Sequence, residues 1–388
     1  MFEKRHNTTM DREPEPKAPA RRSVLGLLSA TGALAALSSV ASADAAGYPN
    51  PATATPPVAA PVYPPSSATS PVGAPVTAPS IARDPEAVPN PIGTRGAQRV
   101  TFELETVEAV GQLADGITYT YWTFRHPGER PQVPGPLLRV RVGDTVDIKL
   151  TNARTNIMPH NIDLHAVMGP GGGGNASFCA PGETKTFSFK ATTPGLYVYH
   201  CATPSVALHI SHGMYGMILV EPEGGLPKVD REFYVMQGEI YTEQPYGKPG
   251  EATASYEKIL AEAPEYYVFN GTVDALTKQF PLKGAVGETI RLFFGVGGPN
   301  KMASFHVIGQ IMARLYDQAS LLSKPLEGVQ TTVVAPGGAI ISEFRLVEPG
   351  TFALVDHAII RIERGAKGFL NVTGPQNLAL FNPHPSSI

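Results

Sequence analysis

Short alternating stretches of apolar and polar residues dominate the chain from residue 98 onward. In stretches such as RVTFELETVEAV, DTVDIKLTN and ETKTFSFKA, β-branched and aromatic residues recur at every second position, and Gly, Pro and Asn separate one stretch from the next. This period of two residues is that of β-strands with one buried face. Helical periodicity is scarce, and the best short candidate is SYEKILAEA at residues 255–263. The pattern therefore predicts an all-β fold of the sandwich type.

The second half of this region repeats the first. VRVGDTVDIKLTN (residues 140–152) returns as GAVGETIRLFFGV (residues 284–296), and APGETKTFSFKATTPGLYVYHCA returns as APGGAIISEFRLVEPGTFALVDHA. The period is too long for a solenoid and suits two tandem domains. We therefore predict one sandwich domain at residues 98–225, a second at residues 226–375, and a C-terminal tail at residues 376–388.

The first 97 residues differ in composition from the rest of the chain. Residues 1–45 contain the pair Arg21–Arg22 before a weakly apolar run that ends in small residues, which is the pattern of a twin-arginine export signal. Residues 46–97 are rich in Pro, Ala, Ser and Thr, and this composition predicts a disordered leader. We therefore expect a periplasmic protein, which an uncleaved signal would tether to the membrane.

The overall composition excludes some classes of function. The net charge of −3, without a basic stripe, argues against nucleic acid as a partner. The only cysteines are Cys179 and Cys201, so a disulfide framework does not hold the fold together. Cys179 is interpreted as a buried free thiol. The loop GPGGGGN at residues 169–175 lacks the Lys-Ser/Thr of a phosphate-binding loop and is interpreted as a flexible connection.

One segment concentrates residues that bind soft metal ions. GLYVYHCATPSVALHISHGMYGMILV contains Cys201, His209 and Met214, and His160 lies upstream in a matching strand. Thiolate, imidazole and thioether ligands together favour copper that cycles between Cu(I) and Cu(II). A Cys–loop–His–loop–Met run at the end of a strand is the cupredoxin pattern. We therefore predict that these four residues hold a copper ion in an electron-transfer site.

Strand geometry predicts a second site on the opposite face. Successive side chains of a strand point to opposite sides of the sheet. If Cys201 points into the sandwich, its neighbour His200 points outward. His160 and His165 are an odd number of residues apart and also face opposite ways, while Asp163 shares the face of His165. His165 and His200 are therefore predicted to be ligands of a second metal ion, with Asp163 beside them.

The second site needs at least one more ligand. His126 and His212 are interpreted as loop or surface residues, whereas His306 and His357 lie on apolar strands of the second domain at places equivalent to the first. Three imidazoles would leave one coordination position open, which is typical of catalytic metal sites. A carboxylate and a spare histidine beside them would supply protons.

Four motifs together resemble those of copper-containing nitrite reductases: MPHNIDLHAVMGPGGG, GLYVYHCATPSVALHISHGMYGMILVEP, SFHVIG and TFALVDHAII. The resemblance covers about residues 98–375. It implies two tandem cupredoxin-like Greek-key β-sandwich domains, a homotrimer, and two copper ions per subunit. The type 1 copper would be held by the four residues of the first site. The type 2 copper would be held by His165, His200 and His357, with His357 donated by the neighbouring subunit.

The resemblance also implies a reaction, NO2⁻ + e⁻ + 2H⁺ → NO + H2O. Asp163 and His306 would be the acid–base pair, and Ile308 would restrict the approach of nitrite. An electron from a cupredoxin or a c-type cytochrome would enter at the type 1 copper and pass through Cys201 and His200 to the type 2 copper. The short spacing between the cysteine and the next ligand histidine resembles the shorter-loop class of the family.

Two other functions fit the sequence less well. A two-domain multicopper oxidase needs paired His-X-His motifs and a second histidine after the cysteine, but the chain has no His-X-His motif and Ala202 follows Cys201. A periplasmic electron carrier or copper-binding protein needs only the first site and would have no use for the residues of the second.

Overall fold

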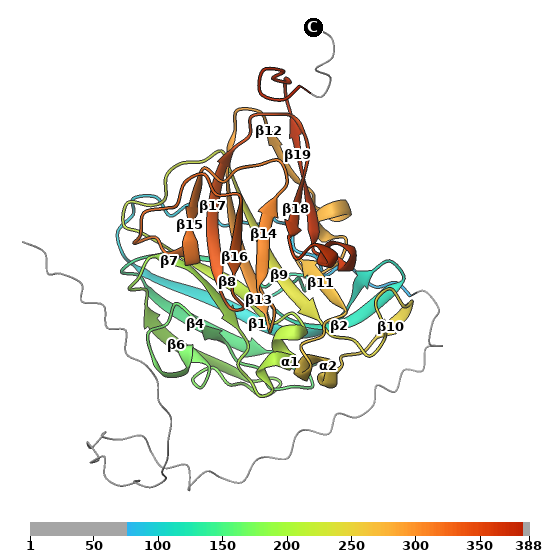
Figure 1. The fold of residues 1–388 in the computed structure, drawn as a ribbon. Helices are drawn as coiled ribbons and strands as arrows, with labels where there is room; N and C mark the ends of the chain where they lie inside the picture. The colour runs from blue at the N-terminus through green and yellow to red at the C-terminus, as the bar shows by residue number, and fades with distance from the viewer. Residues whose placement is uncertain (1–75, 383–388) are drawn as a thin grey trace, which may run out of the picture. The chain divides into compact units, whose positions relative to one another are not determined.

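The computed structural model describes residues 76–382. The predicted export signal, most of the predicted leader and the last residues of the tail lie outside this range. Within it the chain is built mainly from β-strands, which Figure 1 shows in sequence order from blue to red. No helix among the described residues has the length and apolar character that crossing a bilayer requires.

Strands of the first half of the described chain form two sheets, one of which also takes in β10 from the second half. One has the order β10-β2-β1-β4-β6, and the other has the order β3-β8-β7-β5. The strands of the first sheet are β1 (Arg99–Ala114), β2 (Ile117–Arg125), β4 (Thr145–Asn152), β6 (Thr184–Lys190) and β10 (Gly250–Ala252). Those of the second sheet are β3 (Leu138–Arg141), β5 (Asp163–Leu164), β7 (Gly195–His200) and β8 (Tyr215–Glu221).

The second half also forms two sheets, with the orders β11-β9-β13-β17-β15 and β12-β19-β18-β14-β16. The strands of the first of these are β9 (Arg231–Ile240), β11 (Tyr266–Phe269), β13 (Thr289–Gly298), β15 (Arg314–Tyr316) and β17 (Ala339–Arg345). Those of the other are β12 (Leu282–Ala285), β14 (Ala303–Val307), β16 (Thr331–Val334), β18 (Gly350–Asp356) and β19 (Lys367–Thr373).

The two halves share one pattern of strand pairing. β1 pairs in parallel with β4 and antiparallel with β2, just as β9 pairs in parallel with β13 and antiparallel with β11. In the other sheets, β8 lies between β3 and β7 as β19 lies between β12 and β18. This shared order is the structural form of the repeat in the sequence. The predicted class, two tandem cupredoxin-like β-sandwiches, is confirmed. The exact domain boundaries stay a prediction, because β10 lies beyond residue 225 and yet pairs with β2.

Three apolar cores hold these sheets together. One lies inside each sandwich, and the third lies between β-strands of the two halves. On β7, Val198 packs into the core between the halves while the next residue, Tyr199, packs into the first sandwich. Strand alternation thus gives β7 two buried faces, which explains why a residue at its end can reach the interior while its neighbour points elsewhere.

Helices are few and short. α2 (Tyr256–Leu260) lies within the predicted helix candidate, and α1 (Val206–Ser211) was not predicted. Short 3-10 turns occur at Pro170–Gly173, Asp317–Ala319 and Ile359–Arg364, and a π-turn at Ala275–Gln279. A helix of one or two turns leaves too short a period in the sequence to be recognised.

The prediction of disorder is wrong for the end of the leader. Residues 76–97 lie on both sandwiches instead of forming a disordered segment. Ile81 and Ala82 are buried in two different cores. Arg83 is also buried, its Nε donates to the carbonyl of Pro134 (2.6 Å), and its carbonyl accepts from Asn270 Nδ2 (3.1 Å). A Pro-rich stretch has no periodicity of its own, but it can pack in an extended form against strands that already exist.

Candidate metal centres

Three different elements bring the first predicted ligand set together. Cys201 directly follows β7, His209 lies on α1, and His160 precedes β5. The backbone of His160 is fixed by a pair of hydrogen bonds with Cys179, at 3.0 and 2.9 Å. Cys179 is a buried free thiol, as predicted, and it serves the site through its backbone.

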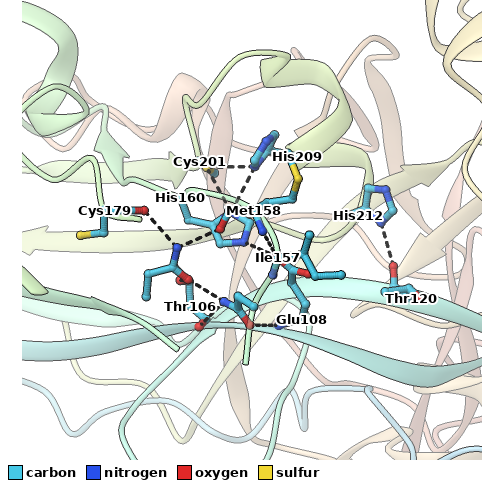
Figure 2. A network of polar contacts seen from close by, with 12 residues as sticks. Thr106, Glu108, Thr120, Ile157, Met158, His160, Cys179, Cys201, His209 and His212 are labelled. Atoms are coloured by element: carbon cyan, nitrogen blue, oxygen red, sulfur yellow. Dashed lines mark hydrogen bonds and ion pairs between the residues drawn. The ribbon is translucent and has the colours of Figure 1, made fainter. Parts of the chain in front are cut away.

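The three side chains converge in the interior of the first sandwich (Figure 2). His160 Nδ1 lies 3.2 Å from His209 Nδ1, and Cys201 Sγ lies 3.3 Å from His209 Nδ1 and 4.0 Å from His160 Nδ1. All three residues are completely buried. Met214 is equally buried and is held between two of them, because its carbonyl accepts from the backbone N–H of Cys201 and its N–H donates to the carbonyl of His209.

The electrostatics of this cluster fit a soft metal ion. Burial lowers the pKa of His209 to about 2, with His160 and His212 adding to the shift, so its imidazole is neutral and offers a lone pair. Burial also raises the pKa of the Cys201 thiol, so a thiolate there needs a compensating cation. Two imidazoles and a buried sulfur with donor atoms within 4.8 Å of one another are a donor set that suits copper.

Glu108 on β1 supports this cluster and was missed by the sequence analysis. Its carboxylate lies 3.2 Å from His160 Nε2 and accepts hydrogen bonds from the backbone N–H groups of Ile157 and Met158. Burial alone would raise the pKa of Glu108, but these hydrogen bonds lower it overall. The carboxylate therefore accepts the Nε2–H of His160 and leaves the lone pair of Nδ1 facing the other two donors. In the alternating sequence of β1, Glu108 looks like any other charged strand residue.

Replacing Glu108 with glutamine is expected to weaken copper binding at the first cluster about 10–100-fold, because the neutral amide no longer fixes His160 as the carboxylate does. The measurement is a copper titration that follows the thiolate-to-copper absorption band. Glu103→Gln on the same strand is the matched control, since among the described residues the side chain of Glu103 pairs only with exposed Lys149. Equal copper affinity for both variants would show that Glu108 does not support the site.

The interpretation of His212 as a surface residue is wrong. It is only 7% exposed, its ring stacks on Trp122 with centroids 4.0 Å apart, and its Nδ1 lies 2.7 Å from the carbonyl of Thr120. Trp122 in turn lies with its edge against His209, at 4.8 Å. His209 lies on α1, and His212 follows the end of this helix, three residues later. The two rings therefore lie on one side of the helix and enclose the indole of Trp122.

The second predicted cluster lies on the other face, as strand alternation requires. Asp163 on β5 stands directly opposite His200 on β7. His165 Nε2 lies 3.1 Å from His200 Nε2, with the two rings nearly perpendicular. The donor atoms of all three residues lie within 4.8 Å of one another, and the group is more exposed than the first. Two imidazoles beside a carboxylate fit a copper ion that keeps open positions.

The remaining predicted residues form a separate pair in the second sandwich. His306 on β14 and His357, which follows β18, have ring centroids 5.6 Å apart. His306 Nδ1 lies 2.7 Å from the carbonyl of Gln330, and Ile308 is 46% exposed. Among the described residues of one chain, neither His306 nor His357 belongs to a group of potential metal ligands with His165 and His200. His357 nevertheless occupies the place after β18 that Cys201 occupies after β7.

Sequence comparisons find relatives that share a large part of the chain. It is 48% identical to the copper-containing nitrite reductase of Neisseria meningitidis serogroup A over 291 residues, which cover 75% of this chain and 74% of that protein. It is 34% identical to the copper-containing nitrite reductase of Alcaligenes faecalis over 262 residues, which cover 63% of this chain and 69% of that protein. The family described as multicopper oxidase matches residues 128–225.

Solved structures give the same picture of the fold. The copper nitrite reductase from Nitrosomonas europaea superposes with a TM-score of 0.61 at 30% identity, covering 72% of this chain and 95% of that chain. A crystal structure of a multicopper oxidase gives the same TM-score at 28% identity, covering 76% of this chain and 95% of that chain. Both relatives are copper proteins, and the fold alone does not distinguish a nitrite reductase from a multicopper oxidase.

Proposed function

This chain belongs to the family of copper-containing nitrite reductases, and on that premise we propose that it reduces nitrite to nitric oxide by one electron, with two copper ions per subunit. The observation that carries the proposal is that the adjacent residues Cys201 and His200 belong to two different ligand clusters. An electron carrier would need only the cluster of Cys201. A multicopper oxidase would need more histidines around the cysteine than this chain has.

We propose His160, Cys201, His209 and Met214 as the ligands of the type 1 copper, and His165, His200 and a partner's histidine as those of the type 2 copper. When bound, these ions would exchange single electrons and offer nitrite a Lewis acid. The chain itself contributes the path between the clusters, because one peptide bond joins Cys201 to His200. A covalent path of this kind keeps the two clusters at a fixed separation.

The reaction consumes two protons, and the chain has two side chains suited to deliver them. Asp163 lies beside His165 and His200. The carbonyl of Gln330 accepts from Nδ1 of His306, which leaves Nε2 of that ring to exchange a proton. Ile308 lies two residues beyond His306 with its side chain exposed, and in the proposed site it would restrict the space for nitrite.

We propose that the type 2 site is completed in a homotrimer by His357 of a neighbouring subunit. Two features support this proposal. Among the described residues of one chain, no third imidazole joins the group of His165 and His200, and His306 and His357 lie together at another place. Exposed apolar side chains near that pair, among them Ile308 and Val333, are suited to contact with a second copy.

We also propose a periplasmic location, reached through the twin-arginine signal, and a cupredoxin or a c-type cytochrome as electron donor. Fractionation of cells would test the first point, because the chain should be found in the periplasm or on its membrane face and not in the cytoplasm. Mixing the oxidised protein with each reduced donor, while following the thiolate-to-copper band, would identify the one that reduces it.

The function itself is tested by product analysis. Copper-loaded protein supplied with a reduced donor and nitrite is expected to release one nitric oxide for each nitrite and each electron consumed. Formation of ammonia, or consumption of dioxygen in place of nitrite, would contradict the proposal.

A further inference from the structure

The glycine-rich loop at residues 169–175 is held in place and is not the flexible connection that the sequence analysis expected. The N–H of Gly172 donates to the carbonyl of Gly169 (3.1 Å), and the N–H of Ser177 donates to the carbonyl of Gly173 (3.0 Å). The hydroxyl of Ser177 is buried within hydrogen-bond distance of the carbonyls of Gly173 and Ile162, and it accepts from the N–H of Ile162. The loop is therefore fastened to the backbone directly before Asp163.

Gly172 lies against the carboxylate of Asp163. A Cβ atom built on Gly172 would lie 1.8 Å from Asp163 Oδ1 and 2.8 Å from its Cγ. Real Cβ atoms essentially never come so close to another heavy atom, so only glycine leaves room for the carboxylate where it stands. Gly171, the preceding residue, has a similar left-handed backbone, with φ of 68° against 55° for Gly172. A Cβ on Gly171, however, would meet nothing nearer than Asn175 Nδ2 at 3.6 Å.

The carboxylate of Asp163 is held in position by packing and not by hydrogen bonds. In the part of the chain that the structure describes, no backbone or side-chain donor forms a hydrogen bond with either carboxylate oxygen. Asp163 lies on the two-residue strand β5, opposite His200, so its backbone is set by that pairing. The direction of the side chain is then limited by the backbone of Gly172.

We propose that Gly172 is a positioning residue for Asp163: its missing Cβ lets the loop close over the carboxylate and hold it beside His165 and His200. This inference rests on the proposed role of Asp163 in proton delivery during nitrite reduction. It gives the glycine-rich loop a catalytic purpose that a flexible connection would not have.

The test compares Gly172→Ala with Gly171→Ala. Both variants place an alanine in a left-handed backbone and should lose thermal stability for that reason, with an added loss in Gly172→Ala from the contact with Asp163. In Gly172→Ala the short Asp163 side chain must rotate away from the new Cβ. Because misplacing a reacting group by about 1 Å can cost on the order of 100-fold in rate, kcat for nitrite is expected to fall about 10–100-fold. Gly171→Ala should keep most of its turnover, and both should keep the thiolate-to-copper band.

A second pair of variants shows whether Gly172 acts through Asp163. In the Asp163→Ala background there is no carboxylate to displace, so adding Gly172→Ala should cause no further loss of kcat. The pH dependence of kcat in Gly172→Ala should also take the shape found for Asp163→Ala, which a merely structural defect would not produce.

The outcomes separate this inference from the proposed function. If Gly172→Ala turns over nitrite like Gly171→Ala while Asp163→Ala is impaired, the positioning role of Gly172 is wrong and the function stands. If the loss from Gly172→Ala persists in full without the carboxylate, the positioning role is also wrong. If Asp163→Ala itself reduces nitrite at the native rate, the proposed role of Asp163 fails, and the inference fails with it.

Discussion

His165→Ala is expected to abolish nitrite reduction while leaving the thiolate-to-copper absorption band in place. His165 Nε2 lies 3.1 Å from His200 Nε2 and belongs only to the second cluster. The first cluster is buried on the other face of the strands and shares no side chain with it. Losing an imidazole from a catalytic metal site removes several kcal/mol of transition-state stabilisation, which corresponds to a fall of about 1,000-fold or more in kcat.

The measurement combines nitric oxide formation, copper content and the absorption spectrum of the same sample. His126→Ala is the matched control, because it removes an imidazole from the same sandwich but from neither cluster. Its turnover and spectrum should both be native. If His165→Ala lost the absorption band together with its activity, the two clusters would not be separate sites.

His357→Ala is expected to be inactive by itself and to regain activity in mixed trimers with His165→Ala. A site between a His357→Ala subunit and a His165→Ala neighbour takes His165 from the first and His357 from the second, so it is intact. Every trimer that contains both variants has one such interface among its three, so the turnover of mixed trimers should rise to about a third of the native value.

Two differently tagged variants, produced together and purified through both tags, provide the mixed trimers. The matched control combines His165→Ala with His200→Ala. Both of these residues come from the same side of the proposed interface, so no mixture restores a complete site. If the His165 and His357 pair also stayed inactive, the site would not be shared between subunits.

Strand alternation was sufficient to predict how the site residues are grouped. The parity of His200 and Cys201, and of His160 and His165, assigns each to its face without knowledge of the fold, and the structure places them accordingly. The internal repeat predicted two tandem sandwich domains for a similar reason, since both signals can be read directly from the sequence.

Contacts between distant segments could not be predicted in this way. Glu108 on β1 contacts His160, which precedes β5 of another sheet, and Gly172 in a loop lies against Asp163. Neither residue shows a local pattern that separates it from other strand charges or turn glycines. His212 was misplaced because the short helix α1 was not recognised. The segment at residues 76–97 was predicted to be disordered because its composition is that of a chain that does not fold by itself. Composition does not show that this segment packs on the surface of the sandwiches.

The most direct test of two different copper sites is electron paramagnetic resonance of the copper-loaded protein during a titration with nitrite. The account predicts two Cu(II) signals. One has the narrow hyperfine splitting of a thiolate site and does not respond to nitrite, and the other has a wide splitting that shifts as nitrite is added. A single thiolate signal that ignores nitrite would contradict the account, and would leave an electron carrier in its place.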